Sequence, residues 1–275
     1  MSAALAELRP AEPAVAPVIA LDVQHVAKRF GGLVAISDMS FQVPEGSVVS
    51  LIGPNGAGKT TAFNIITGFL RPTEGKVLYR GTDMTRLSPP RIAALGVVRT
   101  FQRTSIFGAC TAFENVLIGL HLQGGTGTIR ALLRPASAKR EEERLREEAA
   151  KILDTAGLDR RRGELACNLA YGEQRLLGVS IALAAAPRIL LMDEPAAGLN
   201  PSETAHMMRL VRRIRDQGIT VLLVEHDMKM VMAISDTVVV LNQGRIIANG
   251  PPAEVQAHPE VIAAYLGQGR QHAPR

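Results

Sequence analysis

The chain has 275 residues, 47% of them hydrophobic, which is enough to bury a large core. Its net charge of +5 and pI of about 9.5 allow nucleic acid, an anionic membrane surface or phosphate ligands as partners and do not choose among them. The two cysteines, Cys110 and Cys167, show no disulfide framework or metal-ligand spacing, so we expect both to be small core residues in a reducing cytosol. No apolar run approaches the roughly 20 residues of a membrane span.

Residues 1–18 are rich in alanine and proline, without the basic start and apolar stretch of a secretory signal, and we expect a disordered N-terminal extension. Strand-like alternation then covers 20–26 and 39–43, which predicts an antiparallel β layer. Phe30 lies between these two runs. Its position is compatible with two interpretations, a ring that stacks on an adenine face and an ordinary core residue.

A short apolar, β-branched run over 47–52 predicts a buried strand, and 61–66 has the pattern of a helix. The residues at this junction read Gly53, Pro54, Asn55, Gly56, Ala57, Gly58, Lys59, Thr60 and Thr61. They fit G-x-x-x-x-G-K-[ST], the phosphate-binding P-loop, in the strand-to-helix context that this motif requires. We therefore expect the loop's N–H groups and the helix N-terminus to bind phosphates. Lys59 should reach the β- and γ-phosphates, and Thr60 should give its hydroxyl to Mg²⁺.

A glycine-rich turn with a chance lysine is the alternative interpretation, and the flanking strand and helix argue against it. Further along the chain, strands are predicted over 76–79 and 97–102, and a capping box at Thr111 starts a helix over 112–122. A charged helix over 139–157 carries an apolar stripe. We interpret residues 88–180 as a helical subdomain inserted between two α/β halves.

The second α/β half begins with a buried strand over 188–194, which ends in Asp193 and Glu194. Asn200 caps a helix that ends at Gly218, and a further buried strand covers 220–224. This strand–helix–strand order predicts a mostly parallel sheet covered on both faces, an α/β fold of the P-loop NTPase type. A hairpin over 238–247 and two short helices, 253–257 and 260–266, complete the chain.

Phosphoryl transfer requires a phosphate cradle, a metal, a polarised water and groups that balance the developing charge. Asp193 is placed to act on Mg²⁺, and Glu194, the next residue, is placed to accept a proton from the attacking water. His226 follows the strand over 220–224, at the end where open α/β sheets bind ligands, and can hydrogen-bond the γ-phosphate. A lone histidine is more often structural, so this role depends on the position of His226.

A second loop precedes the Asp193 strand and opens an apolar helix over 176–186. It reads Asn168, Leu169, Ala170, Tyr171, Gly172, Glu173, Gln174 and Arg175. This stretch resembles the signature loop of ATP-binding cassette (ABC) ATPases, usually written L-S-G-G-Q, which ordinary P-loop kinases and GTPases lack. The resemblance implies that residues 169–173 hold the γ-phosphate of an ATP bound in the P-loop of another subunit, with the helix N-terminus facing that anion.

The resemblance covers nearly the whole chain after residue 20 and implies an ABC ATPase domain over 19–267, with its C-terminal hairpin and helices at 236–267 and a disordered tail at 268–275. It further implies that Phe30 stacks on adenine, that Gln102 touches Mg²⁺ and the attacking water, and that His226 is the switch histidine. Asp193 and Glu194 match the Walker B pair. Ala170 departs from the family serine, which removes one hydrogen bond worth roughly 0.5–1.5 kcal/mol. Asn200 replaces the usual D-loop aspartate and removes a charge.

Several stretches are together similar to the LivG-like ATPases of branched-chain amino-acid importers: 98–102, 169–172, 193–201, 225–228 and 264–267. This similarity implies an ATP-binding and hydrolysing subunit, with ATP and Mg²⁺ as cofactors, that powers uptake of branched-chain or related amino acids. Expected partners are a second ABC ATPase subunit, in a heterodimer or a homodimer, two transmembrane permease subunits and, indirectly, a solute-binding protein. The expected location is peripheral, on the cytoplasmic face of the plasma membrane, and no nucleic-acid partner is expected.

Three other functions remain as alternatives. An ABC ATPase for another solute, such as an amide, urea or a lipid, would carry the same motifs. A non-transport ABC ATPase acting on ribosomes or DNA usually has two cassettes or a long coiled coil, whereas this chain has one P-loop and no sustained heptads. A P-loop kinase would leave the signature helix and His226 without a role.

Overall fold

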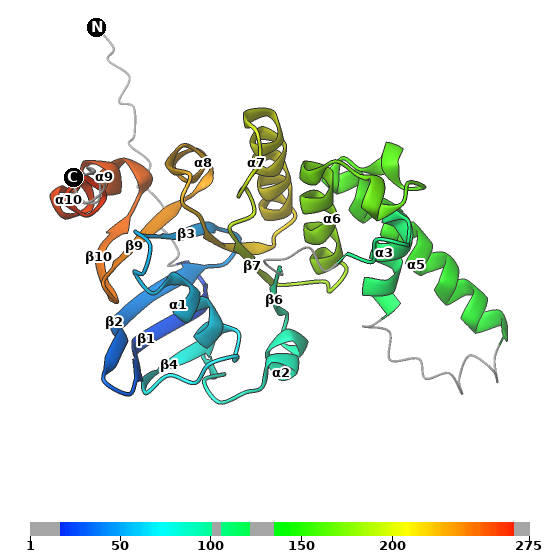
Figure 1. Cartoon of the computed structure of the whole chain (residues 1–275). Coiled ribbons are helices and arrows are strands. Elements are labelled where there is room, and N and C mark those ends of the chain that lie inside the picture. Colours follow the sequence, from blue (N-terminus) through cyan, green and yellow to red (C-terminus); the bar gives the residue numbers. More distant parts are fainter. Residues whose placement is uncertain (1–16, 101–105, 122–134, 267–275) are drawn as a thin grey trace, which may run out of the picture.

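The computed structural model describes residues 17–100, 106–121 and 135–266 (Figure 1). The predicted disordered segments, 1–18 and 268–275, lie outside this range except for Pro17 and Val18. In the described residues one ten-stranded sheet has the order β5-β4-β1-β2-β10-β9-β3-β8-β7-β6. None of the described helices is both long enough and apolar enough to cross a membrane.

One end of the sheet is antiparallel, as the alternating pattern predicts. Its strands are β1 (Ile19–Phe30), β2 (Leu33–Pro44), β4 (Glu74–Tyr79) and β5 (Thr82–Asp83). Both β1 and β2 are longer than the predicted runs 20–26 and 39–43. The pairing of β1 with β2 shifts register near His25, whose φ is 47°. Such a bulge interrupts the period of two on which the prediction rests. The pair Arg245–Asp38 joins this end to the rest of the sheet.

The other end of the sheet is mostly parallel. Its strands are β9 (Thr237–Asn242), β3 (Val48–Ile52), β8 (Thr220–Val224), β7 (Ile189–Asp193) and β6 (Val97–Arg99), with β10 (Arg245–Gly250) antiparallel to β9. Every residue of β3, β7 and β8 is buried, which explains their continuous apolar runs. Val224 pairs with both Leu51 and Asp193, so these three strands end at the same edge of the sheet.

Among the described residues, six helices alternate with the strands or close the chain, as Figure 1 shows. They are α1 (Lys59–Ile66), α2 (Pro89–Ala94), α7 (Pro201–Asp216), α8 (Met228–Ile234), α9 (Pro252–Ala257) and α10 (Pro259–Leu266). Helix α8 was not predicted, although Asp227 caps it by accepting hydrogen bonds from the N–H groups of Lys229 and Met230. With only seven residues it shows little periodicity.

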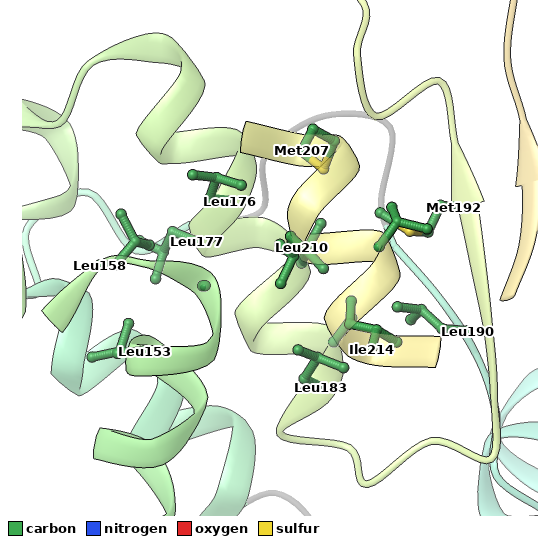
Figure 2. Packing of buried hydrophobic residues seen from close by; sticks show 14 of the residues in the cluster. Leu153, Leu158, Leu176, Leu177, Leu183, Leu190, Met192, Met207, Leu210 and Ile214 are labelled. Carbon is green, nitrogen blue, oxygen red and sulfur yellow. The ribbon is translucent and has the colours of Figure 1, made fainter. Parts of the chain in front are cut away.

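A helical part lies beside the sheet and contains α3 (Ala112–His121), α5 (Pro135–Ala156), α6 (Tyr171–Leu183) and the 3₁₀ turns Asp159–Arg161 and Ala166–Asn168. Figure 2 shows its core, in which Leu153 of α5 and Leu177 of α6 lie on one side, and Leu210 of α7 lies on the other. Helix α6 therefore packs against both the helical part and α7. The predicted apolar stripe of α5 is buried at Leu145, Ala149 and Leu153 and half-buried at Ile152.

The expectation that both cysteines are core residues was wrong. Cys110 is half-buried and Cys167 is exposed, and both are free. They lie where two irregular segments meet on the surface of the helical part, held by main-chain bonds from Cys167 N to Gly108 O (3.2 Å) and from Ala166 N to Cys110 O (2.9 Å). Because these bonds rather than apolar packing fix the segment, cysteine's usual preference for burial did not decide its place.

Candidate active site

The P-loop leaves the buried end of β3 in a conformation that glycine makes possible. Gly53, Gly56 and Gly58 have φ values of 156°, 80° and 108°. A Cβ at Gly53 would overlap the carbonyl oxygen of Leu241, so this position also requires close approach of two backbones. Gly56 differs, because a Cβ there would meet nothing within 4 Å.

Helix α1 begins directly after this loop with its N-terminus open. Gly58 is the N-cap, no side chain caps the helix, and the first turn contains no acidic residue. The first N–H groups of a helix have no partner inside the helix and carry its positive dipole end. In α1 they are therefore available to an anion, and the exposed Thr60 lies in the same turn.

Lys59 folds back over the loop that precedes it. Its Nζ donates hydrogen bonds to the carbonyl oxygens of Gly53 (2.7 Å) and Pro54 (3.0 Å), and the residue is only 8% exposed. Burial lowers the pKa of Lys59 from its ordinary value, while the nearby carboxylates of Glu194 and Asp193 act in the opposite direction. The P-loop lysine and the two acids are thus electrostatic neighbours.

The two acids follow β7 in different environments. Asp193 is 4% exposed, whereas the side chain of Glu194 is 38% exposed. The N–H of Glu194 donates to the Val224 carbonyl (2.9 Å), and its φ of 47° lies in the left-handed region that residues with a Cβ rarely adopt. Strain of this kind concentrates at functional sites. It turns the Glu194 side chain toward solvent while Asp193 stays inside.

His226 meets Glu194 because β7 and β8 are neighbours. Its Nδ1 lies 4.0 Å from Glu194 Oε1 and 3.8 Å from Glu225 Oε2, and its side chain is 60% exposed. Lys59, Asp193, Glu194 and His226 are therefore brought to one edge of the sheet from three separate strands. Gln102, which the resemblance adds to this group, lies outside the described residues.

Glu225 is a site residue that the sequence reasoning missed. It is fully buried, and its carboxylate accepts backbone hydrogen bonds from Ala196 (2.7 Å), His226 (3.1 Å) and Asp227 (3.5 Å). Burial raises the pKa of Glu225, and these hydrogen bonds act against that shift. The carboxylate ties the His226 loop to the loop after Glu194. The available signal was an acid directly after the apolar run Val221, Leu222, Leu223 and Val224.

The residues present suit Mg²⁺ bound together with a nucleotide. Mg²⁺ in nucleotide sites takes only one or two protein oxygens, with phosphates and waters completing the shell. Thr60 and Asp193 supply a hydroxyl and a carboxylate of that kind. No group of three or more His, Cys, Asp or Glu residues able to hold a metal occurs in the described part of the chain.

The predicted signature loop opens α6 and lies at a distance from the P-loop edge in Figure 1. Ala170 and Tyr171 are exposed, whereas Leu169 and Gly172 are buried. Glu173 caps the helix, because its Oε2 accepts from Ala170 N (3.0 Å) while its Oε1 accepts from Arg161 Nε (3.0 Å). Alanine offers no acceptor in return. Glu173 therefore acts on its own backbone in this structure.

The signature loop also contacts residues 197–203 of the same chain; the stretch 197–200 is the one that matches the family D-loop. Tyr171 donates from its hydroxyl to the Ala197 carbonyl (3.2 Å), and a Cβ on Gly198 would lie 3.2 Å from the Tyr171 ring. A Cβ on Gly172 would lie 2.7 Å from the Glu203 carboxyl group. Glu203 in turn caps α7 together with Asn200, so the asparagine that replaces the family aspartate has a structural partner.

Two further aromatic residues, Phe30 and Tyr265, differ in their exposure. Phe30 ends β1, is 44% exposed and has Lys28 Nζ 4.9 Å from its ring centroid. The core interpretation of Phe30 is therefore wrong, and the ring is accessible. Tyr265 of α10 packs with the cluster under Ile52, where burial raises its pKa to about 12 and the backbone N–H of Gly53 acts against that shift.

A strand, an open glycine loop, a helix N-terminus and carboxylates at the adjoining strand ends define a P-loop nucleoside triphosphatase. Comparison with known proteins narrows this class. A family model described as "ABC transporter" matches residues 36–197, and one described as "Branched-chain amino acid ATP-binding cassette transporter" matches residues 245–270. The chain belongs to the ABC transporter family, and as an ABC ATPase it binds and hydrolyses ATP.

Individual relatives agree with this assignment. The chain is 45% identical over 249 residues to the high-affinity branched-chain amino acid transport ATP-binding protein LivG of Salmonella typhimurium, covering 90% of this chain and 98% of the relative. An ATP-binding cassette of an ABC transporter, solved in its ADP conformation, matches with a TM-score of 0.79 and 34% identity over 90% of this chain and 99% of that chain. A dimeric cassette bound to ADP and Pi matches with a TM-score of 0.69 and 25% identity over 84% and 98%.

Proposed function

We propose that this chain is the ATP-hydrolysing subunit of an importer for branched-chain or related amino acids. The observation that carries the proposal is its 45% identity to LivG over nearly the full length of that relative. The C-terminal match over 245–270 supports the same subfamily, since this segment lies outside the region shared by the general family model. The solute would contact the permease and receptor rather than this subunit.

In this proposal the P-loop binds the phosphates of ATP. Lys59 exchanges its bonds to the Gly53 and Pro54 carbonyls for phosphate oxygens, which offer stronger, charge-assisted hydrogen bonds. The loop over 53–58 supplies backbone N–H groups at every position except Pro54, which has none, and Thr60 and Thr61 add theirs at the start of α1. The exposed ring of Phe30 stacks on the adenine. Thr60, Asp193 and Gln102 would hold Mg²⁺, which would neutralise phosphate charge.

Glu194 is the proposed general base. Its exposed carboxylate lies beside His226. A water between the γ-phosphate and Glu194 can therefore lose a proton to Glu194 while His226 orients it. Glu225 holds the His226 backbone through its hydrogen bonds, which fixes the position from which the histidine acts. Gln102 is proposed to contact the same water.

A second cassette is proposed to complete the site. The N-terminus of α6 exposes Ala170 and Tyr171 and lies away from the helix of the P-loop, α1, in Figure 1, and a related cassette has been solved as a dimer. The signature loop of each subunit then holds the γ-phosphate bound to the other. We propose a heterodimer with a second ABC ATPase, with a homodimer as the alternative assembly, and no role for nucleic acid.

The permease is proposed to bind the helical part, whose boundaries at 88–180 remain a prediction. Phe107 and Leu165 are 52% and 40% exposed there, on two segments joined by main-chain bonds such as Cys167 N to Gly108 O. The fully buried Asn115 of α3 bonds both backbone groups of Phe107 and holds this surface in place. This surface would place the chain peripherally on the cytoplasmic face of the membrane, against two permease subunits.

The test is reconstitution of the intact complex in proteoliposomes with its permease, second ATPase and solute receptor. We expect leucine, isoleucine or valine to stimulate ATP hydrolysis and to accumulate inside the vesicles. Stimulation by an amide or urea alone would overturn the proposed solute while leaving the ATPase role intact. A complex that binds ATP but neither pairs its cassettes nor releases phosphate would overturn the motor role.

A further inference from the structure

Arg99, the last residue of β6, joins three elements of the site. Its guanidinium donates one hydrogen bond to Asp193 Oδ2 (2.5 Å) and another to Asn64 Oδ1 on α1 (2.7 Å). The same group lies 5.6 Å from the ring centroid of Phe63. The side chains of Arg99 and Asp193 are only 14% and 2% exposed.

Such a buried pair is expensive to form unless its geometry is well satisfied, and removal of one partner leaves an uncompensated charge. Here the planar guanidinium uses separate N–H groups for Asp193 and Asn64, which fixes its orientation. Asn64 lies one turn of α1 beyond Thr60, so the contact connects the Asp193 strand to the helix of the P-loop. A lysine could not make this fork, because its ammonium is a point charge on a flexible stem.

The two carboxylate oxygens of Asp193 have different environments. Arg99 occupies Oδ2, and Oδ1 has no hydrogen-bond donor among the described residues. One oxygen of Asp193 is thus anchored and the other remains available. Groups that anchor a metal-binding carboxylate in this way set its direction and its affinity for the metal.

We infer that Arg99 is a positioning residue for the magnesium site, which holds Asp193 by Oδ2 so that Oδ1 is presented to the metal or to its water. Asn64 and Phe63 hold the guanidinium in turn. The inference rests on the proposed function, because it requires that Asp193 serves Mg²⁺. It adds to that function a residue of β6, three positions before the predicted Gln102.

The experiment compares ATP affinity with and without Mg²⁺, measured by calorimetry on the full-length chain. The variants are R99K, N64A, D193N and the double variant R99K/D193N, with R86K as a matched control at an exposed arginine. In R99K we expect the gain in ATP affinity caused by Mg²⁺ to fall about tenfold, as for other residues that anchor metal ligands. The affinity measured in EDTA should not change. N64A should show a smaller loss of the same kind, and R86K should match the parent.

The double variant tests whether Arg99 acts through Asp193. If it does, R99K/D193N will show the same Mg²⁺ effect as D193N alone, because the group that Arg99 orients has already been removed. Equal losses with and without Mg²⁺, additive losses in the double variant, or a lower melting temperature as the only change would overturn the inference. If the parent chain itself shows no Mg²⁺-dependent gain, the proposed function fails instead, so the two failures are distinguishable.

Discussion

Two helix N-termini in this molecule carry phosphate-binding motifs, and they are built differently. The N-terminus of α1 has no side-chain cap, and Lys59 beside it is buried against its own loop. The N-terminus of α6 is capped by the Glu173 carboxylate, and Ala170 and Tyr171 next to it are exposed. The N-terminus of α1 lies near Asp193 and Glu194, at the end of strand β7 of the same chain. The N-terminus of α6 exposes Ala170 and Tyr171 and contacts Ala197 and Glu203 of its own chain.

This difference indicates how the work is divided. An open loop of backbone N–H groups with a lysine beside it can bind an anion by itself, because both kinds of donor face the same anion. A helix tip that already carries a carboxylate is a weaker anion site, since the glutamate takes up part of the positive end. We therefore expect the N-terminus of α6 to bind a phosphate only when a second subunit already holds that phosphate. The P-loop half should therefore govern affinity for ATP, and the signature half should govern pairing.

The variant with the largest expected effect, E194Q, separates the pairing of two cassettes from ATP hydrolysis. In E194Q the proposed base loses its charge while the P-loop and the signature loop stay intact. We expect hydrolysis to fall about 10²–10⁴-fold, the usual contribution of a general base. ATP binding should persist and hold a closed pair of cassettes, which size-exclusion chromatography with light scattering will detect. Hydrolysis at the parent rate would show that Glu194 is not the base.

The next test compares two glycines of the P-loop itself. G53A forces a Cβ into the Leu241 carbonyl at a φ of 156°, and we expect it to lower the free energy of unfolding by about 2–4 kcal/mol. G56A meets open space, so only its φ of 80° is unfavourable and about 1 kcal/mol is expected. Urea denaturation of both variants measures the difference. Equal losses would mean that the loop relaxes away from Leu241.

Replacement of the lysine tests the claim that the P-loop half governs affinity. K59A removes charge-assisted hydrogen bonds to phosphate worth about 1.5–3 kcal/mol, so ATP affinity should fall roughly 10–100-fold. The exposed Lys76 of β4 provides the control, and K76A should bind ATP like the parent. Calorimetry measures both affinities. An unchanged affinity in K59A would remove the lysine from the site.

Much of the P-loop half was predictable from sequence because each step there is local. A buried strand, a glycine spacing and a helix follow one another within 47–66, and the structure places them as predicted. Pairing between strands brought Asp193 and His226 to the same edge, which follows from the rule that parallel strands end together. These predictions depended on sequence neighbours and on one general property of sheets.

Other features depend on contacts between residues far apart in the chain, and the sequence did not predict them. Glu225 is buried because loops from two strands converge on it, and Arg99 finds Asp193 and Asn64 across three elements. The residues 169–173 were assigned to γ-phosphate binding as a group. In the structure, Gly172 packs on Glu203, and Glu173 caps its own helix. A sequence motif does not show which of its residues contact a ligand and which pack against the rest of the chain.

The smallest expected effect concerns the signature half alone. A170S restores the family serine hydroxyl at an exposed helix N-cap, a position where serine is favoured. If this loop contacts the γ-phosphate of a paired subunit, the added donor is worth roughly 0.5–1.5 kcal/mol, so pairing of the ATP-bound E194Q form should tighten about two- to tenfold. ATP affinity of the unpaired chain should not change, because the serine is remote from its own P-loop. Analytical ultracentrifugation measures the dissociation constant of the pair. A change in the ATP affinity of the unpaired chain, with no change in that dissociation constant, would contradict the division between the two halves.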